Sequence, residues 1–264
     1  MKEIRGQRWA VTGASGTIGR ALREFLSAES VRLVSIDLAV AAAVSALDRT
    51  VQCDVRDLAA LEAAFVGCSG VVHLAGIADE ADFHDLADVN IVGTYHVLEA
   101  ARRAGVGRVV YASSNRVTGF YSTETLVDEN MPPRPDGFYG VSKVAGEALC
   151  QLYADKFQLS TISVRIGSYE QVPGSGRELR TWLSPDDALR AFHAAMITLE
   201  HNATFYAVSN NSQRWWALDS ASKVGYSPVD DAAEYGPFPE MRRGEPQGGV
   251  YASVEYSIDR MRDR

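Results

Sequence analysis

Short apolar runs alternate with amphipathic patterns between residues 8 and 166, and this alternation limits the possible folds more than any other feature of the chain. Runs typical of β-strands occupy residues 8–12, 31–36, 50–53, 70–74, 108–112 and 161–165. Helical periodicity marks residues 18–27, 58–66 and 83–104, and a further helix is expected around Tyr139. Strands separated by helices favour right-handed crossovers and a parallel sheet covered on both faces. We therefore predict an α/β fold with a doubly wound parallel sheet.

The pattern weakens after Ile166. Gly, Pro and Ser cluster at residues 172–176, and aromatic or polar loops dominate from Ser209 onward. We predict that residues 1–170 form the sheet domain and carry the chemistry. Residues 171–264 would form a small irregular substrate lobe that does not fold independently.

Composition excludes several classes of function. The net charge of −8 argues against nucleic acid or an anionic membrane as a main partner. No apolar run has membrane-spanning length, and the polar start leads directly into the first strand, so we expect neither a membrane segment nor a signal peptide. The three cysteines lack metal or redox spacing, which predicts a reduced, cytoplasmic protein without a metal site.

A glycine pattern follows the first predicted strand and indicates a Rossmann dinucleotide site. Gly13, Gly16 and Gly19 allow a tight turn and close approach of the backbone to a pyrophosphate at the start of the next helix. Asp37 ends the second strand, eighteen residues after Gly19, where a carboxylate can bind the ribose hydroxyls and repel the extra phosphate of NADP. We therefore predict NAD as the cofactor. Further cofactor contacts are expected from Thr17, Ile18, Asp54, Val55, Leu74, Ala75, Gly76 and Ile166. For Asp54 a helix cap is an alternative, and both roles are compatible.

The candidate catalytic residues follow the fifth predicted strand. Tyr139 and Lys143 lie one helical turn apart, and a fixed ammonium lowers the pKa of a neighbouring phenol toward the range of a general base. By itself this spacing also fits a surface tyrosine and a solvated lysine. Ser114 ends the strand at the sheet edge where ligands bind, and its hydroxyl could stabilise charge on a substrate oxygen. Asn90, in the preceding helix, is a candidate anchor for a proton-relay water and a cofactor contact; otherwise it is a mid-helix polar residue.

These motifs resemble the short-chain dehydrogenase/reductase superfamily, and GASGTIG at residues 13–19 is similar to the glycine pattern of its extended branch. The resemblance covers nearly the whole chain. It implies Ser114, Tyr139 and Lys143 as the catalytic triad, with Lys143 also holding the nicotinamide ribose. It further implies a homo-oligomer that associates through helices including the one that carries Tyr139.

A more specific resemblance links the chain to the bacterial NAD-dependent uronate dehydrogenases. It rests on segments 113–119, 134–143, 165–168, 177–182 and 184–187, and on the pair Trp215–Trp216. The resemblance implies oxidation of the C1 hydroxyl of galacturonate or glucuronate to an aldarolactone. It places Ser114, Asn115 and Ser168 against the sugar. Arg177 would pair with the carboxylate, for which a planar guanidinium is well suited, and Arg180 is the rival for that role.

Two positions depart from the family pattern. Arg116 stands where the family has histidine, and Ala78 stands where it has serine. We expect Arg116 either to add a second cationic contact to an acidic substrate or to point to solvent. Ala78 removes one possible hydroxyl contact, so the preferred sugar acid is left open.

Two other functions are compatible with parts of this pattern. A nucleotide-sugar epimerase or dehydratase of the extended branch would need a larger C-terminal lobe than the residues after Ile166 provide. A non-enzymatic NAD-sensing protein would need the glycine turn but neither Tyr139 nor Lys143. The sequence therefore favours a small sugar acid as substrate.

Overall fold

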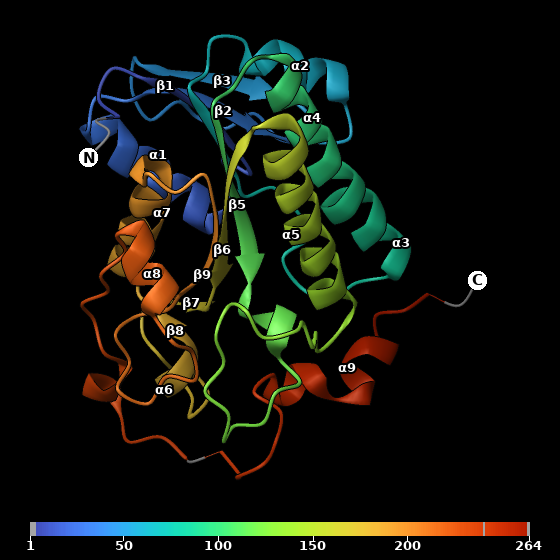
Figure 1. The fold of residues 1–264 in the computed structure, drawn as a ribbon, viewed down its shortest axis with the longest axis vertical. Helices are drawn as coiled ribbons and strands as arrows, with labels where there is room; N and C mark the ends of the chain where they lie inside the picture. The colour runs from blue at the N-terminus through green and yellow to red at the C-terminus, as the bar shows by residue number, and fades with distance from the viewer. Residues whose placement is uncertain (1–3, 240, 263–264) are drawn as a thin grey trace.

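A parallel sheet forms the centre of the computed structural model, which describes residues 4–239 and 241–262 (Figure 1). Within these residues the sheet has seven strands in the order β3-β2-β1-β4-β5-β6-β9, and every neighbouring pair is parallel. The chain runs outward from β1 in one direction and from β4 in the other. The carboxyl ends of these two strands therefore flank the switch point, where open parallel sheets bind their ligands.

The elements have the following bounds. The strands are β1 (Arg8–Thr12), β2 (Arg32–Asp37), β3 (Asp48–Gln52), β4 (Gly70–His73), β5 (Arg108–Ser114), β6 (Ser160–Ile166), β7 (Ser168–Tyr169), β8 (Trp182–Leu183) and β9 (Asn202–Ala207). The α-helices are α1 (Thr17–Ala28), α2 (Leu58–Phe65), α3 (Phe83–Leu86), α4 (Gly93–Arg103), α5 (Phe138–Phe157), α6 (Glu178–Thr181), α7 (Pro185–Ile197), α8 (Asp219–Val224) and α9 (Val254–Ile258). Turns of 3-10 or π geometry are η1 (Ala87–Val92), η2 (Asn115–Thr118), η3 (Ala232–Tyr235) and η4 (Gly249–Ala252).

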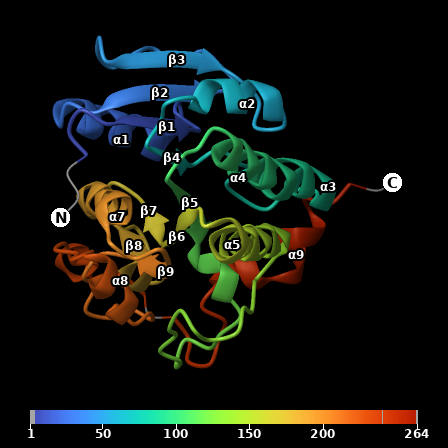
Figure 2. The same ribbon diagram turned by 45° about the horizontal axis from the view of Figure 1, so that its top comes forward.

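Helices cover both faces of the sheet, as Figures 1 and 2 show. Helices α1 and α7 lie together on one face, where Leu22 and Phe192 are buried in one core cluster. Helices α2, α4 and α5 cover the other face, where Leu61 and Val97 are buried in a second cluster. The strands between the two clusters are apolar on both sides because neither face meets water. The predicted α/β fold with a Rossmann-like, doubly wound sheet is confirmed.

The structure differs from the predicted elements in the long helix before β5 and in the region after Ile166. The helix expected over 83–104 is three consecutive segments, α3, η1 and α4, with a π-helical stretch in the middle. Strand β9 and helix α7 were not predicted, although Ser184 caps α7 by accepting a hydrogen bond from the Asp187 amide. β9 is one of the two edge strands of this sheet, and only its second half is buried, so its apolar pattern is short. The sheet therefore extends past residue 170, and the domain division there stays a prediction.

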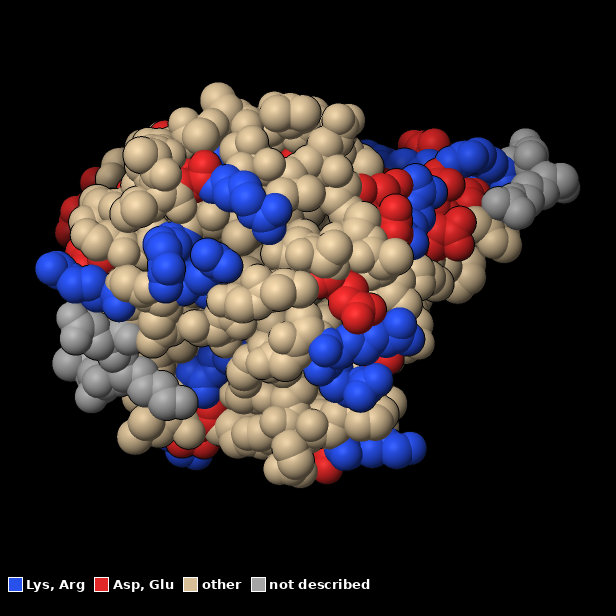
Figure 3. Space-filling view, turned by 90° about the horizontal axis from the view of Figure 1, so that it is seen from above, with Lys and Arg blue, Asp and Glu red and all other residues tan. Residues whose placement is uncertain are grey.

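The described residues contain no helix that is both long and apolar enough to cross a membrane. Among the same residues, no three or more His, Cys, Asp or Glu side chains gather in a way that could hold a metal ion. On the face that Figure 3 shows, acidic and basic side chains lie interspersed, and they gather most densely on the side where α9 lies.

Candidate active site

A cleft of about 860 Å³ lies at the carboxyl ends of the central strands. It runs from the turn after β1 to the segments that follow β6 and precede α9. All the predicted cofactor, catalytic and substrate residues line it, with the single exception of Asn90. The sheet edge therefore brings together side chains that are far apart in the sequence.

The glycine turn at one end of the cleft has no room for larger residues. Gly13 has a φ of 70°, and a Cβ there would lie 2.7 Å from the Ala75 nitrogen. A Cβ on Gly19 would collide with the Gly13 carbonyl oxygen. No side chain caps α1, so the amides of its first turn remain available to an anion. This turn is suited to hold a pyrophosphate, as predicted.

Two acidic residues line the cleft beside this turn. Asp37 accepts a hydrogen bond of 2.8 Å from the Ser15 amide. The Asp54 carboxylate binds Arg56 through both oxygens, and hydrogen bonds from Arg56 lower the pKa of Asp54. The helix-cap alternative for Asp54 is wrong, because Asp57 caps α2 by accepting from the Ala60 amide.

Ser114, Tyr139 and Lys143 meet in the middle of the cleft. Ser114 is the last residue of β5, while Tyr139 and Lys143 lie one turn apart in the first half of α5. All three side chains are buried. The Lys143 ammonium donates to the Ala112 carbonyl oxygen at 2.9 Å and lies 5.5 Å from the centre of the Tyr139 ring. The predicted helix and the predicted meeting of the three side chains are confirmed.

The electrostatics of this group differ from the prediction. Burial raises the pKa of Tyr139 to about 12, although a hydrogen bond with Ser114 and the charge of Arg116 act in the opposite direction. Burial also lowers the pKa of Lys143 to about 8, against the charge of Glu147. Burial outweighs the nearby cations, so in the polypeptide alone the pKa of Tyr139 stays above its usual value and the predicted net lowering does not appear. The charge of Arg116 is one influence that favours the phenolate.

Asn90 lies behind the cleft, in the π-helical stretch η1. Its amide nitrogen donates to the Ile77 carbonyl oxygen and to the Ser142 hydroxyl, each at 3.0 Å. Its amide oxygen accepts from the Ile77 nitrogen at 2.8 Å. Asn90 therefore ties the segment after β4 to α5. The relay role stays a prediction, and both amide hydrogens are already used.

The opposite end of the cleft carries the predicted sugar contacts. The Asn115 amide nitrogen is buried and has no hydrogen-bond partner among the described residues. Arg177 donates from Nη1 to the Ser168 hydroxyl at 3.1 Å and from Nε to the Gln247 carbonyl oxygen at 3.0 Å. No carboxylate of the described residues forms an ion pair with Arg177. Burial lowers its pKa, so an anion in the cleft would relieve an unpaired charge.

The rival arginine does not reach the cleft. Arg180 donates to the Gly176 carbonyl oxygen at 2.8 Å, and its guanidinium lies over the Trp215 ring. It is not among the residues that line the cleft. Of the two arginines, the geometry favours Arg177 as the partner of a substrate carboxylate.

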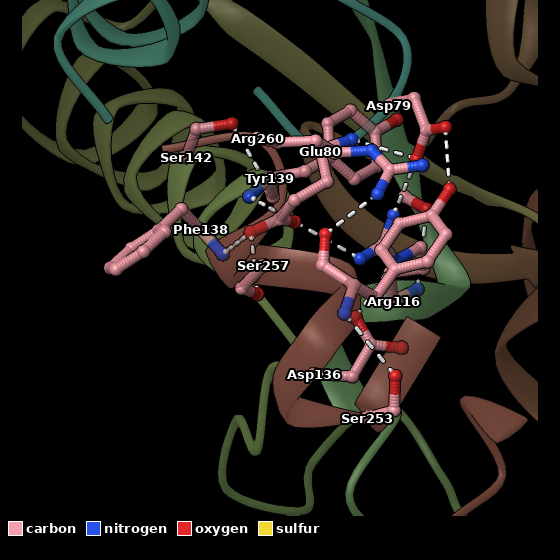
Figure 4. Close-up of polar contacts among 12 residues, drawn as sticks. Asp79, Glu80, Arg116, Asp136, Phe138, Tyr139, Ser142, Ser253, Ser257 and Arg260 are labelled. Carbon is pink, nitrogen blue, oxygen red and sulfur yellow. Dashed lines mark hydrogen bonds and ion pairs between the residues drawn. The ribbon is translucent and has the colours of Figure 1, made fainter. Parts of the chain in front are cut away.

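Arg116 is neither exposed nor free. Its side chain lines the cleft, but the residue is only 5% exposed. Its guanidinium binds Asp136 at 2.8 Å, Asp79 at 3.0 Å and Glu80 at 3.1 Å (Figure 4). The expectation that Arg116 points to solvent is therefore wrong. The geometry also argues against a second contact to an acidic substrate, because three carboxylates already surround this cation.

Several cleft residues were not found from the sequence. Asp79, Glu170 and Tyr251 line the cleft without belonging to any motif. The Tyr251 ring lies under the guanidinium groups of both Arg116 and Arg177, with centroid distances of 4.6 and 5.1 Å. Tyr251 comes from the irregular C-terminal part, where neither periodicity nor spacing indicates which residues return to the sheet edge.

Comparison with known proteins connects this geometry to a family. A family model described as the NAD dependent epimerase/dehydratase family matches residues 9–170. A uronate dehydrogenase from Pseudomonas syringae pv. tomato is 40% identical over 85% of this chain and 82% of its own length. An L-arabinose 1-dehydrogenase (NAD(P)(+)) from Haloferax volcanii is 35% identical over 86% of this chain and 98% of its own length.

A solved structure agrees with the sequence matches. A mutant of uronate dehydrogenase from Agrobacterium tumefaciens, complexed with NAD, superimposes with a TM-score of 0.86. It is 36% identical, and the match covers 93% of this chain and 97% of that one. The likeness therefore includes the C-terminal part that the family model does not reach.

Proposed function

The chain belongs to the NAD dependent epimerase/dehydratase family, and on that premise we propose that it oxidises the C1 hydroxyl of a hexuronic acid with NAD. The observation that carries the substrate class is Arg177, a cation without a carboxylate partner among the described residues, in the same cleft as Tyr139. The relatives named as uronate dehydrogenases support the same class.

The residues present fit NAD. Gly13, Gly16 and Gly19 leave the backbone space that a pyrophosphate needs, and α1 begins there without a side-chain cap. Asp37 lies at the end of β2 and would bind the adenosine ribose, where its charge disfavours the phosphate of NADP. When bound, NAD supplies the acceptor for a hydride.

The chemistry requires one base and one acceptor. Tyr139, as the phenolate, takes the proton of the C1 hydroxyl while the hydrogen on C1 leaves with its electron pair as hydride. The C1–O bond of the cyclic sugar becomes a carbonyl, so the product is a lactone, formed with NADH. Ser114, which contacts Tyr139, stabilises the charge that develops on the substrate oxygen.

Lys143 and Asn115 have supporting roles in this proposal. Lys143, fixed by Ala112, would hold the nicotinamide ribose and favour the phenolate by its charge. Asn115 has a buried amide without a partner among the described residues and would donate to a sugar hydroxyl. Ser168, already bonded to Arg177, would contact the sugar beside the carboxylate.

Location and assembly stay predictions. We expect a cytoplasmic protein, and the three cysteines are buried and unpaired. We expect a homo-oligomer through the α4 and α5 face, where Tyr95, Leu152 and Phe157 are exposed. Sedimentation analysis of the purified chain tests the assembly, and a monomer at all concentrations would contradict it.

The function is tested with purified protein, NAD and a panel of sugars while NADH absorbance is followed. Galacturonate and glucuronate should be oxidised, whereas galactose and glucose, which lack the carboxylate, should react poorly. Turnover of neutral sugars but not of uronates would refute the carboxylate hypothesis. Turnover of nucleotide sugars alone would favour the epimerase or dehydratase alternative, and NAD binding without any turnover would favour a sensor.

A further inference from the structure

Arg116 is the centre of a buried charge cluster that reaches the catalytic helix. We define this cluster as Arg116 with Asp79, Glu80 and Asp136, which Figure 4 shows around the start of α5. Each of Nε, Nη1 and Nη2 of Arg116 binds a different carboxylate. A planar guanidinium can bridge several carboxylates in this way, whereas a lysine ammonium cannot match the same fork.

Glu80 connects this cluster to the catalytic tyrosine. Its two oxygens accept hydrogen bonds from the amides of Phe138 at 2.7 Å and of Tyr139 at 3.1 Å. These are the first two residues of α5, and the residue before them, Gly137, offers no side-chain cap. A carboxylate at a helix N-terminus satisfies free amides and interacts favourably with the helix dipole. Glu80 therefore fixes the turn from which the Tyr139 side chain projects.

Arg116 also contacts the tyrosine ring itself. Its guanidinium carbon lies 5.2 Å from the centre of the Tyr139 ring. Glu80 thus binds the backbone of Tyr139, and Arg116 faces its ring. Glu80 and Arg116 also bind each other at 3.1 Å.

The C-terminal segment closes the cluster from the outside. The Tyr256 hydroxyl donates to Asp79 at 2.6 Å, and the Ser257 hydroxyl donates to Glu80 at 3.0 Å. The rings of Tyr251 and Tyr256 also face the Arg116 guanidinium, at 4.6 and 5.6 Å. Helix α9 therefore binds two of the three carboxylates that Arg116 binds, Asp79 and Glu80.

We propose that Arg116 is a positioning residue for the dehydrogenase reaction: through Glu80 and by direct contact it holds Tyr139 in its reactive position, while α9 keeps the cluster closed. This inference rests on the proposed function, because it makes Arg116 a support for the proton acceptor, Tyr139, and not a ligand of the substrate carboxylate. It follows that loss of Arg116 should reduce kcat and leave sugar binding largely intact, in contrast to loss of Arg177.

The charged groups around Tyr139 set the expected pH response. The cations are Arg116 from η2 and Lys143 from α5, the carboxylates are Asp79, Glu80 and Asp136 from the flanking loops, and the phenols Tyr251 and Tyr256 come from the C-terminal segment. Without Arg116 the carboxylates are uncompensated, so the phenolate is disfavoured and the rise of kcat with pH should move to higher pH. A residue that merely stabilised the fold would not shift this profile.

The test compares Arg116→Gln, Arg116→Lys and Tyr256→Phe with the wild-type protein, using galacturonate and NAD. For Arg116→Gln we expect kcat to fall about 10- to 100-fold, the size of a weakened general base, with the KM for galacturonate within about threefold. Arg116→Gln leaves the carboxylates without their cation. Arg116→Lys keeps the charge but not the planar fork, and it should lose about fivefold in kcat. Tyr256→Phe removes the hydrogen bond from Tyr256 to Asp79. It should move the rise of kcat to higher pH, as Arg116→Gln does, but by a smaller amount.

Arg190→Gln is the matched control, since Arg190 also contacts two carboxylates, Asp187 and Asp230, but does not line the cleft. Its kinetics should match the wild type. NAD affinity, measured by fluorescence without substrate, should be unchanged in all variants.

Three results would overturn the inference: a rise in KM with unchanged kcat, which would make Arg116 a substrate ligand; unchanged kinetics; or lower thermal stability without a shift of the pH profile. If the wild-type protein itself does not oxidise galacturonate, the proposed function fails instead.

Discussion

Replacing Arg177 by alanine gives the sharpest test of the substrate class. A guanidinium has five N–H donors, and the structure uses two of those on Arg177, toward Ser168 and Gln247. The remaining donors are enough for a bidentate pair with a carboxylate in the cleft. The variant removes both the charge and these donors, and it leaves the Tyr139 end of the cleft unchanged.

The size of the effect follows from the setting of this arginine. Because Arg177 has no ion-pair partner among the described residues, a substrate carboxylate would not have to displace one. Removing one partner of a desolvated, hydrogen-bonded charge pair costs about 2–3 kcal/mol at the lower end of the usual range. That energy corresponds to roughly 30- to 150-fold in kcat/KM for a uronate. The loss should appear mainly in KM, since the contact is the same in the ground state and the transition state.

The assay uses two substrates that differ only at C6. Galacturonate carries a carboxylate there, and galactose carries a hydroxymethyl group, so the ratio of their kcat/KM values isolates the contribution of the carboxylate. Arg177→Ala should lower this ratio by most of the predicted factor, because galactose does not use the charge. Arg177→Lys keeps a cation but loses the planar fork. Its ratio should lie between those of the wild type and Arg177→Ala, about 5- to 10-fold below the wild type.

Arg180→Ala is the matched control, since Arg180 lies close in sequence but does not line the cleft. It should leave the ratio unchanged. An equal loss with galacturonate and galactose in Arg177→Ala would refute the reasoning, because it would show that Arg177 supports the site as a whole. A change of the ratio in Arg180→Ala but not in Arg177→Ala would assign the carboxylate to the rival residue.

Three further predictions concern the catalytic and cofactor residues. Tyr139→Phe should keep NAD affinity, measured by fluorescence, and lose about 10²–10⁴-fold in kcat, since the phenol oxygen is the proposed base; an active variant would exclude that role. Activity should rise with pH because Tyr139 must lose a proton. Lys143→Met should move this rise of kcat to higher pH, because the variant removes a cation that favours the phenolate. An unshifted profile of kcat against pH would contradict this. Asp37→Ala should lower the ratio of kcat/KM with NAD to kcat/KM with NADP, since it removes the carboxylate at the ribose end. An unchanged ratio would show that Asp37 does not select the cofactor.

The sequence was sufficient for the parts of the fold and site that depend on local patterns. Strands β1, β2, β4, β5 and β6 are largely buried, so most of their apolar runs are continuous and easily recognised. The glycine turn is equally local, because Gly13 and Gly19 are needed by backbone contacts within the turn and with the neighbouring strand end. The Tyr139 and Lys143 pair depends only on helical spacing. These features could be predicted because each is determined by residues close in the chain or by one periodicity.

Strand β9 and helix α7 show where this approach stops. β9 pairs with β6 alone and starts with half-exposed residues, so it lacks the continuous apolar run of the inner strands. The cap of α7 was visible as Ser184 followed by proline and two acidic residues, a signal that the weak pattern after Ile166 concealed. Edge elements depend on a neighbour already in place, and the sequence does not show that neighbour.

Arg116 shows the same limit for electrostatics, and with a larger consequence for function. An arginine beside the sugar contacts has two obvious roles when considered alone, a substrate ligand or a solvated side chain. Its actual partners, Asp79, Glu80 and Asp136, come from two loops that the fold brings together. One cation among three carboxylates leaves formal negative charge near Tyr139, which repels a substrate carboxylate. A uronate should therefore bind with C1 toward Tyr139 and its carboxylate toward Arg177, the cleft cation that has no ion-pair partner among the described residues.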